Sequence, residues 1–235
     1  MSVRVAVAVA LALAGCGHVG FDPNRSGTTD GSSGDGGGGG GGGGGDASDV
    51  AFPALGGQTD NFESTTLSGI WNPYADAPST YGVAGGQLQL QLGANASGVY
   101  VGVLTSGTDD LREHAATIEA VTSTPSTNCG CYLEVTDGTH SVDLVENSGE
   151  LEARVDNSPF MSIAYVPAVH VWWQMFDHAG TTTWQTSPDG HTWTVLATMP
   201  TMGFESTVHV NLGGGADNAS AAPGTCVFDN FNLPP

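Results

Sequence analysis

The chain has 235 residues, with four Lys or Arg against 24 Asp or Glu, which gives a formal net charge of −20 at pH 7. This balance argues against nucleic acid as a partner, because phosphate contacts require clustered basic side chains. It also argues against electrostatic docking on anionic lipid. Past residue 15 the chain lacks long runs with the helical spacing of apolar residues, and its many Gly, Thr, Ser and Val residues favour an all-β domain with many turns.

The first fifteen residues read as an export signal. A positive start is followed by an unbroken apolar run over residues 5–14, and about ten residues are too few to span a bilayer, which needs about 20. Leu13-Ala14-Gly15-Cys16 follows directly and resembles the bacterial lipobox. The alternative is an ordinary secretory signal with an unrelated cysteine.

The resemblance to the lipobox implies a lipoprotein. The signal peptide, residues 1–15, is expected to be cut before Cys16, whose thiol and new amine carry diacylglyceryl and palmitate-type acyl chains. Two or three such chains hold a protein firmly on a membrane. Gly17 rather than Asp follows the cysteine, so we expect a place in the bacterial cell envelope, at the outer membrane rather than the inner one.

Residues 16–50 form the second predicted segment. They are rich in Gly and Ser and include an uninterrupted glycine run over residues 36–45. Ordering such a stretch costs backbone entropy without compensating burial, so the sequence predicts a disordered linker between the lipidated Cys16 and the rest of the chain. A glycine-rich phosphate cradle is the alternative, but the helix with Lys-Ser/Thr that it requires is missing.

Residues 51–235 are predicted to form one domain. Short alternating runs are separated by turns such as Asp137-Gly138 and Asp189-Gly190, and Leu88, Leu90 and Leu92 mark a strict period of two. About a dozen strands spaced this way indicate an antiparallel sandwich of two sheets. We expect strands over residues 87–92, 99–104, 114–122, 131–136, 141–146, 151–155, 161–166, 169–176, 181–186, 193–197, 207–212 and 225–233.

Two segments carry a resemblance to a known fold family. Residues 171–176 (VWWQMF) and 183–193 (TWQTSPDGHTW) are similar to the central hairpins of concanavalin A-like lectin/glucanase sandwiches, laminin-G-like members included. Residues 60–63 and 228–233 resemble the first and last strands of that family. The resemblance implies a concanavalin A-like jelly roll and says far less about function.

The resemblance also suggests ligands. Sugar-binding sandwiches stack pyranose rings on exposed aromatic side chains, and Trp172, Trp173 and Trp184 are the candidates here. Trp172 and Trp173 are consecutive on a strand and must point to opposite faces, so one of them is expected in the core. Core packing is the alternative role for each of the three.

Calcium is the candidate cofactor. In similar jelly-roll modules, acidic residues near the first and last strands share one Ca²⁺, which implies a site built from Asp60, Glu63 and Asp229. Calcium takes six to eight oxygen ligands from carboxylates, carbonyls and water. The alternative is that Asp229 only caps its strand through hydrogen bonds.

Three cysteines remain once Cys16 is acylated. In an exported protein one disulfide is expected, and Cys129 and Cys131 have the same strand parity, so either could pair with Cys226. We take Cys131–Cys226 as the working pair. A disulfide between Cys129 and Cys131 would close a very tight loop.

Catalytic patterns are weak in this sequence. The resemblance to glucanases of this fold implies a Glu-x-Asp-x-x-Glu strand whose carboxylates act on one glycosidic bond. Glu146, Glu150 and Glu152 do not fit that spacing. Glu134 and Asp137 are expected on opposite faces of a regular strand. The chain is therefore predicted not to be an enzyme.

The leading functional prediction is a lipid-anchored cell-envelope module that binds ligand, most plausibly glycan. One alternative is a structural or adhesion lipoprotein that contacts another envelope or extracellular protein. The other is a glycoside hydrolase, which would need two carboxylates about 5–10 Å apart. No nucleic-acid partner is expected.

Overall fold

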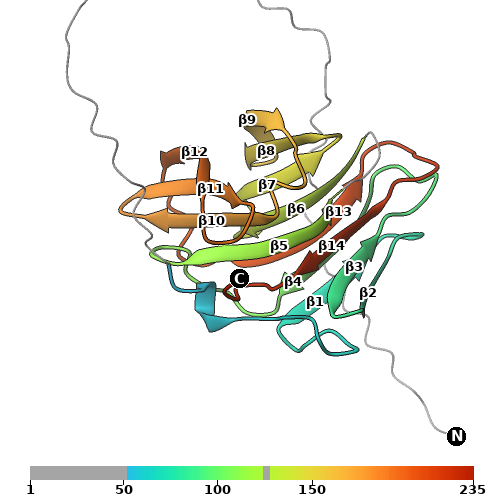
Figure 1. Cartoon of the computed structure of the whole chain (residues 1–235), viewed down its shortest axis with the longest axis horizontal. Coiled ribbons are helices and arrows are strands. Elements are labelled where there is room, and N and C mark those ends of the chain that lie inside the picture. Colours follow the sequence, from blue (N-terminus) through green and yellow to red (C-terminus); the bar gives the residue numbers. More distant parts are fainter. Residues whose placement is uncertain (1–51, 124–127) are drawn as a thin grey trace, which may run out of the picture. The chain divides into compact units, whose positions relative to one another are not determined.

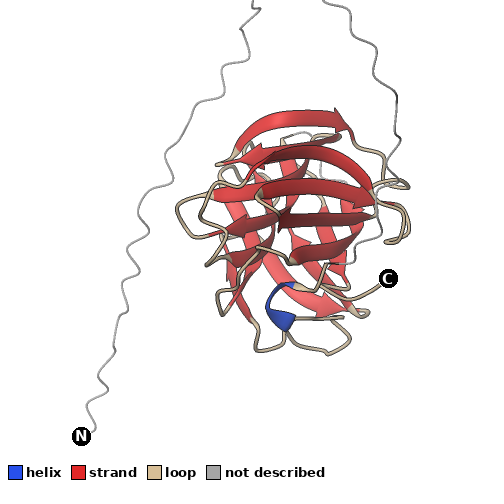
Figure 2. Ribbon diagram, turned by 90° about the vertical axis from the view of Figure 1, so that its left-hand side faces the viewer, coloured by secondary structure: helices blue, strands red, loops and turns tan. Residues whose placement is uncertain are grey.

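Residues 52–123 and 128–235, which the computed structural model describes, form fourteen strands and one short 3₁₀ helix, Leu55–Gly57. Figure 2 shows this predominance of strand. The predicted signal peptide, Cys16 and the predicted linker lie outside the described residues. The strands are β1 (Trp71–Ala75), β2 (Thr80–Ala84), β3 (Gln87–Gln91), β4 (Val99–Thr105), β5 (Ala115–Ser123), β6 (Cys129–Thr136), β7 (Ser141–Asn147), β8 (Glu150–Val155), β9 (Ser158–Ala164), β10 (Trp172–His178), β11 (Thr181–Ser187), β12 (Thr194–Pro200), β13 (His209–Ala216) and β14 (Thr225–Asp229).

The strands form two seven-stranded sheets (Figure 1). Sheet 1 has the order β1-β4-β13-β6-β7-β8-β9, and sheet 2 has the order β12-β11-β10-β5-β14-β3-β2. Every pairing between named strands is antiparallel. The predicted all-β jelly-roll sandwich is confirmed. Consecutive strands often change sheet, and the last two strands, β13 and β14, are interior strands of sheets 1 and 2.

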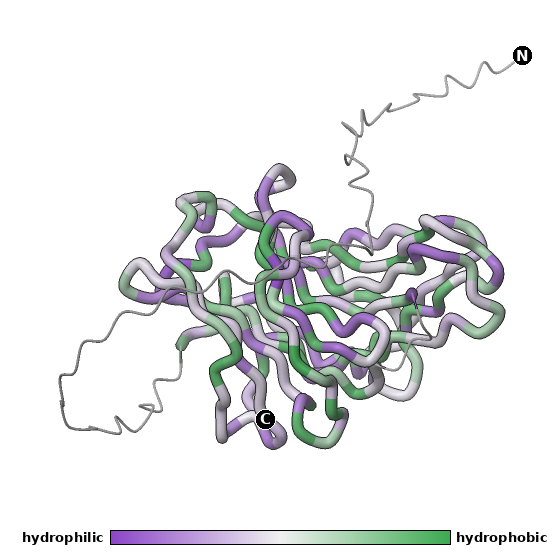
Figure 3. Tube along the Cα trace, turned by 90° about the horizontal axis from the view of Figure 1, so that it is seen from above, coloured by the Kyte–Doolittle hydropathy of each residue, from purple (hydrophilic) through white to green (hydrophobic). Residues whose placement is uncertain are grey.

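Alternating side chains build the core between the sheets. In β6, Cys131, Leu133 and Val135 are fully buried, whereas the residues between them are only half-buried. This period of two puts one face of each strand in the core, and hydrophobic and hydrophilic residues alternate along many strands in Figure 3. The alternate, more polar side chains of these strands therefore lie on the outer face of sheet 1.

The sequence pattern did not predict two of the strands, β1 and β2. β1 carries Pro73 and β2 carries Gly82, and both residue types are unfavourable inside a strand. Each strand lies at the edge of its sheet, where a missing backbone donor or side chain is tolerated. The final predicted strand is also shorter than expected, since it ends at Asp229 and Asn230 has a positive φ of 51°.

The turn between β11 and β12 is organised by one carboxylate. Asp189 accepts hydrogen bonds from the backbone N–H groups of His191 and Thr192, at 2.9 and 2.7 Å, and from the hydroxyl of Ser187 at 2.9 Å. These bonds favour the ionised form and lower the pKa of Asp189 to about 2. The turn motif therefore serves the hairpin rather than a ligand.

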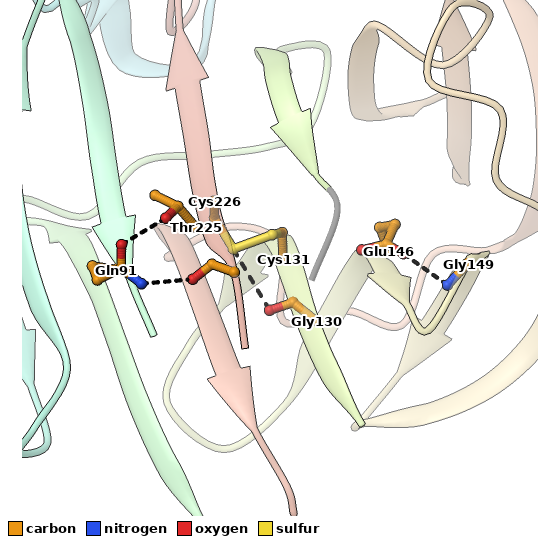
Figure 4. Close-up of a disulfide and its surroundings, with 8 residues drawn as sticks. Gln91, Gly130, Cys131, Glu146, Gly149, Thr225 and Cys226 are labelled. Carbon is orange, nitrogen blue, oxygen red and sulfur yellow. Dashed lines mark hydrogen bonds between the residues drawn. A yellow bond between two sulfur atoms is a disulfide. The ribbon is translucent and has the colours of Figure 1, made fainter. Parts of the chain in front are cut away.

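A disulfide joins the two sheets (Figure 4). Cys131 of β6 and Cys226 of β14 are bonded with a Cα–Cα distance of 5.6 Å, while Cys129 is buried and takes no part in the bond. A Cβ atom on Gly214 would lie only 2.7 Å from the Cys226 sulfur. The absence of a side chain at Gly214 therefore makes room for the cross-link.

Removing this disulfide should destabilise the fold. It closes a loop with a sequence separation of 95 residues, and loss of such a cross-link releases unfolded-chain entropy worth about 2–5 kcal/mol. We expect the double variant Cys131→Ala/Cys226→Ala to lose about this much free energy of unfolding in urea. Cys129→Ala, which keeps the cross-link, should lose less. An unchanged denaturation midpoint when the parent protein is reduced would contradict this expectation.

Candidate functional site

The β6–β7 hairpin places two carboxyl groups side by side on the outer face of sheet 1. Its register pairs Thr136 with Ser141 and therefore Glu134 with Asp143. Because Leu133 points into the core, its neighbour Glu134 and the opposing Asp143 project outward. Residues directly opposite on antiparallel strands have Cβ atoms about 4.5–5.5 Å apart, so the two carboxyl groups interact directly.

The same register extends across the neighbouring strands. Asn211 of β13 lies opposite Glu134, and Arg154 of β8 lies opposite Asp143. The Asn211 side-chain amide donates to Glu134 Oε2 at 2.6 Å. Arg154 is held by a 2.5 Å ion pair with Glu152 on its own strand. We call Asn211, Glu134, Asp143 and Arg154 the polar row.

Both carboxyl groups in the polar row bind protons more tightly than usual. Burial raises the pKa of Glu134, and the hydrogen bond from Asn211 opposes that rise. The pKa of Asp143 lies well above its ordinary value of 3.8, because of burial and then because of the negative charge of Glu134. Two adjacent carboxyl groups resist ionising together, so the pair retains a proton at a higher pH than separate carboxyls would.

The two carboxyl groups differ in access. Glu134 is half-buried, whereas Asp143 is only 3% exposed and accepts a 3.2 Å hydrogen bond from the Ser141 hydroxyl. Glu134 is therefore the more accessible of the two carboxyl groups.

Tyrosine hydroxyls orient the polar row. Tyr74 of β1 donates to the carbonyl oxygen of the Asn211 side chain at 3.0 Å, and its oxygen lies 2.8 Å from that of Tyr132. Because the one hydroxyl proton of Tyr74 goes to Asn211, Tyr132 donates to Tyr74. The chain of hydrogen bonds fixes the Asn211 amide with its N–H groups directed at Glu134.

Glycines on β13 make room for the tyrosine rings. A Cβ atom on Gly213 would lie 2.2 Å from the Tyr132 ring, and one on Gly215 would lie 2.6 Å from the ring of Tyr100. Tyr100 remains 41% exposed. It therefore presents an aromatic surface on the same face of the sheet as the polar row.

The predicted tryptophan contacts require correction. Trp172 is 5% exposed, and Trp173 and Trp184 are fully buried. The Trp173 indole donates to the His170 carbonyl at 2.9 Å, and Trp184 packs against Phe160 with 5.1 Å between ring centroids. Buried indoles cannot stack on a sugar, so these three side chains have structural roles and exposed aromatic surface comes from tyrosine instead.

The proposed calcium ligands have other partners. Asp60 accepts hydrogen bonds from the Ser68 hydroxyl and the Trp71 indole, at 2.7 and 2.9 Å. Asp229 accepts one from the backbone of the next residue, and burial raises its pKa, with smaller contributions that include Glu63. Within residues 52–123 and 128–235, no group of three or more His, Cys, Asp or Glu is arranged to hold a metal ion. Calcium binding stays a prediction.

β7 carries part of the glucanase pattern named above. Ser141, Asp143 and Glu146 match its spacing, with Ser in place of the first Glu. However, β7 pairs in unbroken register, so Glu146 points to the opposite face from Asp143. It is 1% exposed and accepts a 2.8 Å hydrogen bond from the Gly149 N–H (Figure 4). The second outward carboxyl comes from Glu134 instead, a pairing that counting back from the Asp137-Gly138 turn would have revealed.

No protein-family model matches the sequence, and no curated protein matches it. Solved structures do match. SCLam, a non-specific endo-β-1,3(4)-glucanase from family GH16, aligns with a TM-score of 0.56 and 9% identity over 78% of this chain and 91% of its own. The catalytic domain of a Thermotoga petrophila RKU-1 endo-1,3-β-glucanase (laminarinase) gives 0.52 and 11% over 74% and 94%. The Crh5 transglycosylase in complex with NAG gives 0.54 and 10% over 76% and 84%.

At these identities the likeness establishes the fold, a concanavalin A-like β-sandwich. It also contradicts the prediction that the chain is not an enzyme, because the structures that share this fold are glucanases and a transglycosylase. The paired carboxyls here lie on two neighbouring strands. A spacing rule along one strand does not detect such a pair of carboxyl groups.

Among the described residues, no helix combines the length and apolar character needed to cross a membrane.

The Asp143 carboxyl should leave a signature in the pH dependence of stability. Its pKa is higher in the folded protein than its ordinary value of 3.8, so the folded state binds the proton more tightly and loses stability as pH rises above about 4. Asp143→Asn lacks this pH-dependent loss of stability. Between pH 4 and 8, its free energy of unfolding in urea should therefore rise relative to that of the parent. Glu113→Gln, which removes a carboxyl whose pKa is lowered, should not. A difference between Asp143→Asn and the parent that is independent of pH would contradict the assignment.

Proposed function

We propose that the protein acts on glycans, cleaving or transferring a glycosidic bond at the polar row. The main support is the pair of outward-facing carboxyl groups of Glu134 and Asp143, whose pKa values are both raised. Perturbed acidic groups placed together on a face are typical of catalytic sites. The enzymes that share the fold act on glycans by their names, which supports the choice of substrate class.

Glu134 takes the role of general acid and base. In the first step its carboxyl proton moves to the leaving glycosidic oxygen as the bond from that oxygen to the anomeric carbon breaks. The bonding pair stays with the oxygen, and the sugar is left as an oxocarbenium ion beside the Glu134 carboxylate. The Glu134 carboxylate then accepts a proton from a water molecule or a sugar hydroxyl, whose oxygen bonds to the anomeric carbon. Water gives hydrolysis and a sugar hydroxyl gives transfer, and Glu134 is regenerated in both cases.

The other polar groups position Glu134 and set its protonation. Asn211, oriented by Tyr74, holds one carboxyl oxygen in place. Asp143 lies opposite Glu134 on β7, and the negative charge of Glu134 helps to raise the pKa of Asp143 because two adjacent negative charges repel. The exposed ring of Tyr100 offers a surface for a neighbouring sugar ring.

The charge of this face selects uncharged glycans. Glu150 and Glu152 lie on the same outer face as the carboxyl pair, and the guanidinium of Arg154 is occupied by Glu152. A sulfated or uronic acid polymer would meet like charge there, which costs binding energy. Neutral β-1,3- and β-1,3(4)-glucans are therefore the first substrates to test.

Replacing Glu134 should remove turnover without removing the fold. With a soluble β-1,3-glucan and a mixed-linkage β-1,3(4)-glucan as substrates, Glu134→Gln should lower kcat by about 10²–10⁴-fold, the contribution of a positioned proton donor. Asp143→Asn should lower kcat less and shift the pH profile. Glu113→Gln, a surface carboxylate paired with His178, serves as the matched control. Full activity of Glu134→Gln would refute the assignment, as would a folded parent that neither releases reducing ends from either glucan nor changes the chain lengths of the glucan products.

We also propose that acyl chains on Cys16 hold the protein on a bacterial envelope membrane, at the outer membrane in a host that has one. The support is the apolar run and the lipobox resemblance in the sequence. Acyl chains contribute about 0.8 kcal/mol per buried methylene, so the anchor would retain the sandwich at the surface while the predicted linker gives it reach.

The anchor is tested on the full chain expressed in a bacterium. The parent should incorporate labelled palmitate and partition into the detergent phase, and Cys16→Ala should do neither. Cys129→Ala, which leaves the lipobox intact, should behave like the parent. Mass spectrometry showing an unmodified Cys16 thiol, or cleavage at another position, would rule the anchor out.

A further inference from the structure

A cavity opens where the two sheets separate at one edge of the sandwich. β1 ends sheet 1 and β2 ends sheet 2, and the two strands are neighbours in Figure 1. The cavity between them has a volume of about 470 Å³ and includes residues from both strands and from the segment that leads into β1. This volume lies in the range of ligand pockets, about 300–1,000 Å³, although the hollow is open to solvent rather than enclosed.

Side chains of β2 face into this cavity. Tyr81 and Val83 pair with Leu90 and Leu88, which are fully buried, so Tyr81 and Val83 lie on the inner side of sheet 2. Val83 packs against the core, whereas Tyr81 stays 43% exposed. Trp71 of β1 lines the same cavity and is only 5% exposed. The cavity therefore has a buried indole and, toward solvent, an accessible phenol ring.

A hydrogen-bonded carboxylate fixes one wall. Asp60 accepts hydrogen bonds from Ser68 and from the Trp71 indole, and its backbone exchanges two hydrogen bonds with Phe231, at 3.0 and 2.8 Å. Asp60 thus ties the segment before β1 to the segment after β14. The wall is held in place before any ligand arrives, which lowers the entropic cost of binding.

The lining is mostly apolar and carries no charge. It contains the hydroxyl groups of Thr65, Thr66 and Ser68, and none of the described lining residues carries a charge. In a chain with a net charge of −20, a neutral cavity favours a neutral ligand. β2 also pairs with one strand only, so its outer edge offers backbone N–H and C=O groups for further hydrogen bonds.

We propose that this cavity is a second glycan-binding site, separate from the polar row, that holds one or two sugar units of a neutral polysaccharide with a ring stacked on Tyr81. An aromatic face, hydroxyl groups and edge-strand backbone groups together match a sugar ring, which has apolar faces and a rim of hydroxyls. This inference rests on the proposed glycan activity for its ligand class. The site would keep an insoluble polymer attached while the polar row acts on another part of it.

The test separates polymer binding from turnover. Binding to insoluble β-1,3-glucan is measured by sedimentation, in the Glu134→Gln background so that the polymer is not degraded. Adding Tyr81→Ala should weaken this binding about tenfold, or about 1.4 kcal/mol, and Tyr81→Phe should preserve it. Val121→Ala, at a 39% exposed position on β5 of the same sheet, is the matched control. If Tyr81→Ala fails to fold, Tyr81→Gln keeps a long side chain without the aromatic face.

Turnover is measured on laminaritetraose with Glu134 intact. Tyr81→Ala should leave kcat/KM for this short substrate within about twofold, because turnover takes place at the polar row and the cavity is separate from it. A twofold change is far below the tenfold loss expected for polymer binding. Unchanged polymer binding in Tyr81→Ala would overturn the second site. Equal loss of polymer binding and of laminaritetraose turnover would also overturn it, since the cavity would then belong to the reaction site. Tyr81-dependent binding by a parent that turns over no glucan would uphold the cavity and refute the proposed catalysis instead.

Discussion

The register of four antiparallel strands is the constraint on which the candidate site depends. β13, β6, β7 and β8 pair without a shift, and this alignment puts Asn211, Glu134, Asp143 and Arg154 in one line across sheet 1. A slip of one residue would turn every side chain of a strand to the other face. The core side of β6 prevents such a slip, because Leu133, Val135 and the bonded Cys131 are fully buried. Hydrophobic packing on one face thus determines the chemistry available on the other.

The site weakens the sheet that carries it. Two neighbouring carboxyl groups are removed from water, and part of β13 is glycine, which lowers the stability of a strand interior. The disulfide between β6 and β14 compensates, since it ties the strand of Glu134 to the opposite sheet. Chains of hydrogen bonds through Tyr74, Tyr132 and Asn211 add order on the outer face. Such a local loss of stability is expected where function and stability make opposing demands.

The sequence predicted most strands and the sandwich architecture. It predicted poorly which residues from different strands lie close together. Period-two runs revealed twelve strands and the sandwich, but not the edge strands with Pro73 and Gly82. The pairing of Glu134 with Asp143 was accessible by counting from the hairpin turn. The burial of Trp172 was not, because Gly190, from the turn after β11, lies against its ring. Nor could strand parity distinguish Cys129 from Cys131, since the two share a face and only the placement of β14 separates them.

The order of strands along the chain has a consequence for biosynthesis. β13 and β14 come last in sequence among the described strands, yet each lies inside its sheet with earlier strands on both sides. Until they emerge from the ribosome, β4 and β6 lack the strand between them, as do β3 and β5. Such long-range pairing makes folding slow and late. Neither sheet can therefore be completed before both of these strands are available.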